Sequence, residues 1–159
     1  MSEQATTGGG AQFALQRIYI KDMSFESPKS PDAFVWQWKP AVNLELNSHH
    51  KLVGTDIFEV VLSVTVTVKK EDGEVVYLSE VQQAGIFLVK GMDDAVIAKT
   101  LGSFCPSVLF PYAREAIDSL VIKGSFPPLM LAPVNFEAIY EQSRQQSAPA
   151  AEAGDVIVN

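Results

Sequence analysis

The chain has 159 residues, of which 47% are hydrophobic and 19% are charged, so it is long and apolar enough to fold around one core. A formal net charge of −7 argues against nucleic acid and anionic membrane surfaces as partners and favours a basic partner. Cys105 is the single cysteine, which excludes an intramolecular disulfide and suits a reducing compartment.

The ends of the chain differ from its middle. Residues 1–11 are polar and glycine-rich, and residues 143–159 are rich in Gln, Ala and Pro, so both are expected to be flexible. The N-terminus lacks the pattern of a secretory signal, and no apolar run is long enough for a membrane helix. We therefore expect one cytoplasmic domain over residues 12–142, without direct membrane insertion.

The first expected strand is "FALQRIYIKDMSFE", residues 13–26. Its alternation predicts one apolar face, formed by Phe13, Leu15, Tyr19, Met23 and Phe25. The other face is mixed and includes Asp22 and Glu26. The prolines of "SPKSP" then end the strand, because proline has no N–H to donate to a ladder.

Three further strands follow. "AVNLELN", residues 41–47, alternates, and "EVVLSVTVTV", residues 59–68, has one β-branched apolar face that indicates a half-buried antiparallel strand. Asp72-Gly73 then predicts a two-residue hairpin turn before the returning strand "YLSEVQQAGIFLV", residues 77–89.

The turn fixes a register that can be worked out from residue numbers. It pairs Val64 with Val81 and Thr65 with Glu80, so Glu80 and Leu78 lie on the polar face. The same turn would place Glu71 opposite Glu74 beside the loop, a like-charge pair that a four-residue loop would avoid.

Helices are expected after the strands. Asp93 is a candidate cap for a short helix that Gly102 would end, and Ser107 is a candidate start for a longer helix that ends before Gly124. Asn135 would cap a final helix. Strands followed by helices indicate an α+β fold, an antiparallel sheet with helices on one face.

The long helix carries apolar residues on more than one side. Its main stripe is formed by Leu109, Ala113, Ala116, Ile117, Leu120 and Val121. Tyr112, Ile122 and Phe126 lie away from this stripe. Because a helix that is apolar on several sides usually packs against more than its own sheet, we expect oligomerisation through the helical layer.

Little in the sequence indicates catalysis or metal binding. His49 and His50 are adjacent and are expected in a solvated loop, and Cys105 is expected to be a buried small hydrophobe. Phosphate-loop and nucleophile motifs are not found, and the carboxylates are scattered. No catalytic residue, metal or cofactor is therefore predicted.

Two groups of residues remain open to interpretation. Phe34, Trp36 and Trp38 lie in a proline-bounded connection between the first two strands, where they would either cover the core or line a ligand groove. The acids of the mixed strand faces would by default be solvated, as would an isolated surface leucine such as Leu78.

Several motifs together resemble the SecB family of bacterial export chaperones. They are "QRIYIKDMSFE", the Trp38–Pro40 "WKP", "EVVLSVTVTV", "EVQQAGIF", "LGSFCPSVLFPYARE" and "FPPLMLAPVNFEAIY". The resemblance implies four antiparallel strands in the order 1-4-3-2 with two main helices on one face. It also implies a homotetramer, a dimer of dimers, that binds unfolded precursor proteins and passes them to the ATPase SecA without catalysis.

The resemblance also implies two sets of site residues. The SecA-binding residues would be Asp22, Glu26, Leu78 and Glu80. The client-binding groove would involve Phe34, Trp38, Phe136 and Tyr140. Family tails are often more acidic than this one, in which the acids are Glu152 and Asp155, so a contact of the tail with SecA is not implied.

Two other functions compete with this interpretation. A SecB-like chaperone of a toxin–antitoxin system would stabilise an antitoxin, but the full set of SecA-docking residues argues against that as the sole role. A small-ligand enzyme in the cleft between helices and sheet would need convergent polar groups, which the sequence does not show.

Overall fold

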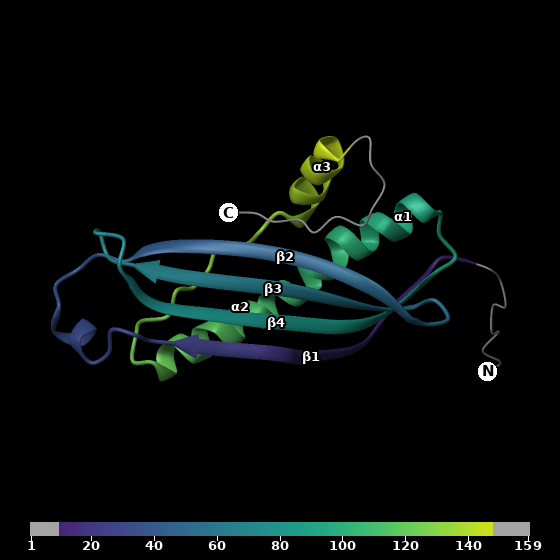
Figure 1. The fold of residues 1–159 in the computed structure, drawn as a ribbon. Helices are drawn as coiled ribbons and strands as arrows, with labels where there is room; N and C mark the ends of the chain where they lie inside the picture. Colours follow the sequence, from purple (N-terminus) through teal and green to yellow (C-terminus); the bar gives the residue numbers. More distant parts are fainter. Residues whose placement is uncertain (1–9, 148–159) are drawn as a thin grey trace.

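A computed structural model of the chain describes residues 10–147. Four antiparallel strands form one twisted sheet in the order β1-β4-β3-β2, which confirms the predicted order (Figure 1). The strands are β1 (Gln12–Glu26), β2 (Ala41–Gly54), β3 (Ile57–Lys69) and β4 (Val75–Lys90). A crossover connection containing the short 3₁₀ helix η1 (Asp32–Val35) joins β1 to β2.

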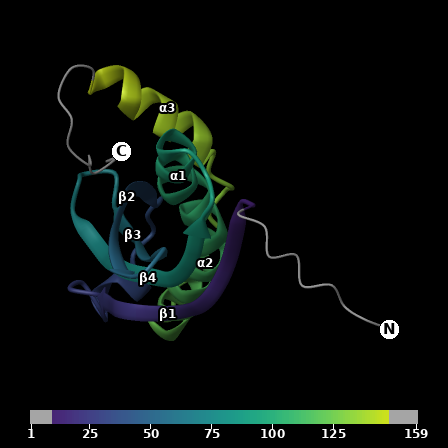
Figure 2. The same cartoon turned by 90° about the vertical axis from the view of Figure 1, so that its right-hand side faces the viewer.

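The helices form a second layer on one face of the sheet. α1 (Asp94–Lys99), the π-helical turn η2 (Thr100–Phe104) and α2 (Cys105–Lys123) follow one another without a break. After an extended connection, α3 (Phe136–Gln146) packs on η2. Figure 2 shows the twisted sheet curving around the long helix α2. α3 lies on the opposite side of the molecule from β1. Within residues 10–147, no helix is both long and apolar enough to cross a membrane.

The core lies between the sheet and α2. Alternate residues of β3 face α2 and are fully buried: Val60, Leu62, Val64, Val66 and Val68. The facing stripe of α2 is buried at Leu109, Ala113, Ile117 and Val121, as the helical spacing predicted. Each buried Val, Leu or Ile side chain in this set contributes about 1.5–3 kcal/mol when it is removed from water, so this interface fixes the sheet against the helix.

The register of β3 against β4 is the one that the sequence predicted. Val64 lies opposite Val81, and Thr65 lies opposite Glu80. The alternation therefore places Glu80 on the face of the sheet that points away from the helices.

The turn between these strands is longer than predicted. The N–H of Lys70 donates to the carbonyl of Glu74, and the N–H of Gly73 donates to the carbonyl of Lys70. The loop thus has three residues, with Gly73 in the left-handed region at a φ of 88°, and the expected two-residue turn is wrong. The three-residue loop avoids the pairing of Glu71 with Glu74.

Two irregularities in β1 change which of its residues face outward. The register against β4 shifts between Leu15 and Arg17 and again between Ile20 and Asp22. Each shift inserts one extra residue, so the alternation is inverted between the shifts and restored after the second. The expected apolar face is therefore wrong at Tyr19, which lies on the outer face opposite Ala84.

The helix boundaries differ from expectation at two residues. Gly102 does not end a helix and Ser107 does not start one, because the helix continues through both, and the Ser107 hydroxyl donates to the Phe104 carbonyl at 2.6 Å. A Cβ on Gly102 would lie 2.8 Å from the Tyr140 ring. This glycine therefore allows α3 to approach η2 closely.

Two of the remaining four boundaries, at Gly124 and Asn135, agree with expectation. Gly124 follows α2, and the Asn135 side chain accepts a hydrogen bond from the N–H of Ala138 at 3.0 Å, which caps α3. Asp93 precedes α1, but its side chain makes no capping hydrogen bond. Helix α3 continues to Gln146, beyond residue 143 where the tail was expected to begin.

Three further expectations concern the two histidines, the cysteine and the ends of the chain. His49 and His50 lie in β2, paired with β3, so the expected loop is wrong. Cys105 is buried as expected, and burial raises the pKa of its thiol to about 12. The expected flexibility of residues 1–9 and 148–159 concerns parts of the chain outside the described residues.

Candidate functional site

The outer face of the sheet carries the predicted acidic residues. Because β1 regains its alternation after the second irregularity, Asp22 and Glu26 share this face. Asp22 lies opposite Gln82, Ser24 lies opposite Glu80, and Glu26 lies opposite Leu78. The register thus brings together four predicted residues, Asp22, Glu26, Leu78 and Glu80, which we call the docking patch.

The docking patch is compact and negatively charged. Glu26 and Leu78 are direct cross-strand neighbours, and Glu80 lies diagonally between Asp22 and Glu26. Direct neighbours have Cβ atoms about 4.5–5.5 Å apart, so the side chains form one surface. None of the ion pairs formed within residues 10–147 involves these three acids. Their charges are therefore available to a partner.

Sequence reasoning missed one acid on this face. Glu45 of β2 lies opposite Thr65, which itself lies opposite Glu80, so Glu45 and Glu80 share one row across the sheet. Glu45 is exposed. The alternation of "AVNLELN" already placed it on a polar face, but only the pairing of β2 with β3 aligns it with the docking patch.

A second carboxylate on the outer face is already paired. Glu59 is only 7% exposed, accepts a hydrogen bond from the Tyr19 hydroxyl, and lies 3.1 Å from the Lys21 ammonium. Burial alone would raise the pKa of Glu59, but the hydrogen bonds from Tyr19 and Lys21 outweigh burial and lower it. Burial and this hydrogen bond raise the pKa of Tyr19 to about 12. These three residues therefore form an internally satisfied cluster.

Two of the predicted client-binding residues lie in the crossover connection. Phe34 is 50% exposed, and its ring centroid lies 5.4 Å from that of Phe126. Trp38 is half-buried, and its indole N–H donates to the carbonyl of Ala33 at 3.3 Å. Trp36 and Trp38 both pack against the core.

The β3–β4 hairpin fixes this connection in place. The Glu71 carboxylate accepts a hydrogen bond from the Lys39 N–H at 2.6 Å, and Lys29 pairs with Glu74 at 2.8 Å. The Lys70 ammonium lies 4.2 Å from the centroid of the Trp36 ring, within the range of a cation–π contact. The hairpin thus determines where the aromatic side chains of the connection are presented.

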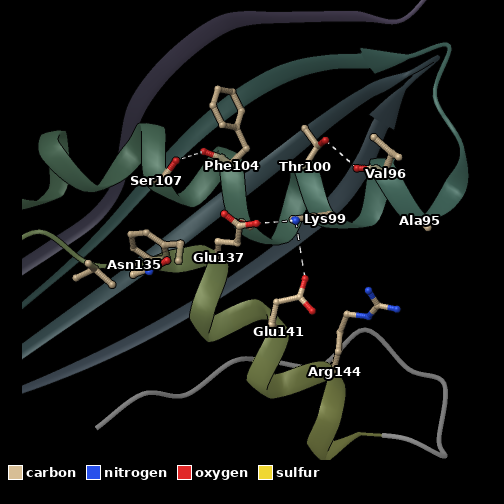
Figure 3. A pocket seen from close by; sticks show the side chains of 13 residues that line it. Ala95, Val96, Lys99, Thr100, Phe104, Ser107, Asn135, Glu137, Glu141 and Arg144 are labelled. Atoms are coloured by element: carbon tan, nitrogen blue, oxygen red, sulfur yellow. Dashed lines mark hydrogen bonds and ion pairs between the residues drawn. The ribbon is translucent and has the colours of Figure 1, made fainter.

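The other two predicted client-binding residues lie on α3. The Phe136 ring is buried, with its centroid 5.8 Å from that of Phe110, and Tyr140 packs on Gly102. Figure 3 shows the pocket between α3 and the long helix, where Lys99 of α1 reaches two carboxylates of α3. Its ammonium lies 2.7 Å from Glu137 and 3.9 Å from Glu141.

The two aromatic pairs occupy different places. Trp38 lines a cavity beside the β3–β4 hairpin, whereas Phe136 lines cavities that α3 forms with η2 and with β2. The connection between α2 and α3, residues 125–134, joins the two aromatic pairs. At one end its Phe126 contacts Phe34, and at the other end it leads into Phe136.

The site thus combines an acidic sheet face, whose patch residues form no ion pair within residues 10–147, with aromatic side chains that range from half-exposed Phe34 to buried Phe136. In the part of the chain that the structure describes, no group of three or more His, Cys, Asp or Glu side chains could hold a metal ion.

The SecB family model, preprotein translocase subunit SecB, matches residues 6–147, and the chain belongs to this family. Relatives include the protein-export protein SecB of Stutzerimonas stutzeri, with 57% identity over 96% of this chain and 98% of the relative. The protein-export protein SecB of Pseudomonas savastanoi is 54% identical over 98% of this chain and 99% of the relative. The protein is thus a chaperone of protein export.

A solved structure shares the fold. It is the SecB-like chaperone of Mycobacterium tuberculosis in complex with a ChAD peptide from an antitoxin, with a TM-score of 0.64 and 17% identity. The match covers 79% of this chain and 91% of that chain. At this identity the likeness concerns the fold, and the toxin–antitoxin alternative is not favoured over export.

Proposed function

We propose that this chaperone binds unfolded precursor proteins in the cytoplasm, keeps them competent for translocation and delivers them to the ATPase SecA. The observation that carries the proposal is the docking patch. Its residues come from two strands far apart in sequence, and the sheet register gathers them on one face. The three acids form no ion pair within residues 10–147, so their negative charge supports binding to a basic partner.

The chemistry of the patch fits a basic segment of a partner such as SecA. Asp22, Glu26 and Glu80 supply negative charge, and Leu78 supplies an apolar contact among them. Complementary charge of this kind speeds association and orients the partner. Glu45 extends the negative surface toward β2.

Client binding needs no chemical step by this chain. An unfolded precursor exposes apolar side chains and free backbone groups. Aromatic side chains would bind the former and the open edges of β1 and β2 the latter, whatever the sequence of the client. Of the four predicted groove residues, Phe34, Trp38 and Tyr140 would supply the accessible aromatic surface, and the buried Phe136 would support it from beneath. We propose neither a catalytic activity nor a cofactor, and release would follow when SecA competes for the client.

A homotetramer, a dimer of dimers, would multiply the client sites. Phe104, Tyr112 and Ile122 of the helical layer are about half exposed, as expected for apolar side chains that a second copy covers. A long client could then contact several copies, and weak contacts would reinforce one another through effective concentration.

The test is an aggregation assay with an unfolded precursor protein diluted from denaturant, with and without SecA. We expect the chain to slow aggregation, and SecA with ATP and inverted membrane vesicles to convert the bound precursor to translocated precursor. Aggregation at the unassisted rate would contradict the chaperone proposal. Slower aggregation without translocation would support the chaperone activity but would contradict SecA as the protein that receives the precursor.

A further inference from the structure

The connection between α2 and α3, residues 125–134, is held by few backbone contacts. Three of its residues are prolines, which have no N–H. Within the described part of the chain, residues 127–134 form no backbone–backbone hydrogen bond. Ser125 and Met130 have φ angles of 66° and 50°, a region that residues other than glycine rarely adopt. The backbone of this connection therefore does not stabilise its own path.

One side chain of α2 supplies the missing support. Oδ1 of Asp118 accepts hydrogen bonds from the N–H of Leu129 at 2.9 Å and from the N–H of Met130 at 3.3 Å. The Met130 side chain is 76% exposed, so it does not anchor the connection itself. A carboxylate that accepts two N–H groups makes stronger hydrogen bonds than a neutral acceptor does. Asp118 thus fixes the middle of the connection.

Both ends of the connection reach the aromatic pairs assigned to clients. At one end the Phe126 ring lies 4.6 Å from the Tyr77 ring and 5.4 Å from the Phe34 ring, between centroids. At the other end, Asn135 caps α3 immediately before Phe136. Figure 1 shows the connection running from the end of α2 to the start of α3.

Asp118 also lies close to the aromatic cluster at the first end of the connection. Burial raises the pKa of Tyr77 to about 12, and the negative charge of Asp118 adds to the increase. The carboxylate is therefore near enough to Tyr77 for its charge to be felt there, in addition to its two hydrogen bonds to the connection.

We infer that Asp118 is a positioning residue for client binding, because it holds the connection whose Phe126 packs on Phe34 and whose other end leads into Phe136. The inference rests on the proposed client-binding function. Without the two hydrogen bonds the connection would be held by the apolar packing of Leu129, Leu131 and Val134 alone. Its backbone would then be free to sample more paths, and a client would have to order it on binding. Such ordering lowers affinity even when every contacting side chain is retained.

The experiment measures the affinity of the full-length chain for a fluorescently labelled polypeptide that cannot refold, reduced and carboxamidomethylated α-lactalbumin. Asp118→Ala should raise the Kd about tenfold, which corresponds to about 1.4 kcal/mol. Asp118→Asn keeps an Oδ1 acceptor in the same place and should bind within about threefold of the wild type.

Two controls separate positioning from a general loss of stability. Ile117→Val removes a buried methylene next in sequence and destabilises the core without touching the connection. Ser119→Ala removes only the partner of the exposed Lys123 ammonium. Both variants should bind the polypeptide like the wild type, and SecA binding should be unchanged in all four variants.

Hydrogen exchange at Leu129 and Met130 provides the second readout. Exchange should speed up in Asp118→Ala and remain slow in Asp118→Asn. The inference is wrong if Asp118→Ala binds the polypeptide normally, if Asp118→Asn loses as much affinity as Asp118→Ala, or if Ile117→Val loses affinity equally. A wild-type chain that does not bind the polypeptide would contradict the proposed function itself, which is a separate outcome.

Discussion

Single carboxylates on the outer face of the sheet differ in what surrounds them. Glu59 is buried between Tyr19 and Lys21, so its charge is already balanced inside the molecule. Glu80, on the same face, takes part in no ion pair within the described residues, so a partner can use its charge. The same side chain thus serves structure at one position and is available for binding at another.

Reversing the charge of Glu80 tests the docking patch. Glu80→Lys should weaken SecA binding by at least about tenfold and leave affinity for unfolded polypeptide nearly unchanged, because like charges would then face the basic partner. Glu80→Gln, which removes the charge but keeps the shape, should have an intermediate effect. Calorimetry with purified SecA gives the first affinity, and a titration with labelled unfolded polypeptide gives the second. An equal loss of SecA and client binding would mean that the patch is misassigned.

Buried ionisable groups predict a loss of stability in alkali. The pKa values of Cys105 and Tyr77 are both raised by burial to about 12, whereas the corresponding groups of the unfolded chain ionise from about pH 9 upward. Because the pKa values are raised in the folded state, the unfolded state loses these protons at a lower pH than the folded state does. The contribution of these two groups to the free energy of unfolding should therefore be constant below about pH 9 and be lost from there toward pH 12.

Urea unfolding between pH 7 and 11 measures this dependence. Cys105→Ala should show a shallower decline just above pH 9, because the thiol no longer contributes while Tyr77 still does. A free energy of unfolding that stays constant to pH 11 in the wild type would contradict the prediction.

At the scale of elements, one glycine sets the distance between α3 and the long helix. A Cβ on Gly102 would lie 2.8 Å from two atoms of the Tyr140 ring, closer than van der Waals contact allows. Glycine costs a helix about 0.5–1 kcal/mol relative to alanine, so its presence in the π-helical turn needs a packing reason. The approach of α3 provides that reason.

A double-mutant cycle tests this contact. Gly102→Ala should destabilise the wild type by about 1–3 kcal/mol, because the new methyl group displaces Tyr140. In a Tyr140→Ala background the same substitution should be neutral or stabilising, since only the helix propensity remains. Urea unfolding gives the coupling between the two sites. Equal effects of Gly102→Ala in both backgrounds would mean that the ring does not restrict this position.

At the scale of the whole molecule, the helical layer leaves apolar side chains uncovered. Phe104, Tyr112 and Ile122 are exposed, whereas Phe126, also expected to lie away from the main stripe, is buried in the aromatic cluster beside Tyr77. The exposed residues come from η2 and α2, on the layer that a second copy of the chain would cover.

The proposed homotetramer predicts a mass of four chains in solution, measured by light scattering. Replacing both Tyr112 and Ile122 by aspartate should lower the mass, because burying two carboxylates in an apolar interface is unfavourable. Unchanged circular dichroism would show that the single chain still folds. A monomeric wild type would remove the tetramer from the proposal, and an unchanged mass of the variant would place the interface elsewhere.

Much of the sheet could be predicted because alternation and register are local properties. The pairing of Val64 with Val81 depends on the residue count across the β3–β4 hairpin. The three-residue loop changes this count by one, and the register shift between Val68 and Lys69, where Val76 is the extra residue, restores it. The inverted segment of β1 around Tyr19 could not be predicted, because a register shift leaves no distinctive residue pattern. The role of Gly102 could not be predicted either, because the contact that explains it comes from Tyr140 in another helix.

By itself, the sequence determined the four strands, their alternation outside the inverted segment of β1, and the family, because these depend on residue order and on short-range backbone preferences. The gathering of Asp22 and Glu26 with Glu80 was predicted only through the family's strand order, and the structure confirms the neighbouring strands that it requires. Tertiary structure alone decided that Glu45 joins this face and that Asp118 supports the α2–α3 connection. Both depend on contacts between segments whose relative positions are set by packing, which residue order does not reveal.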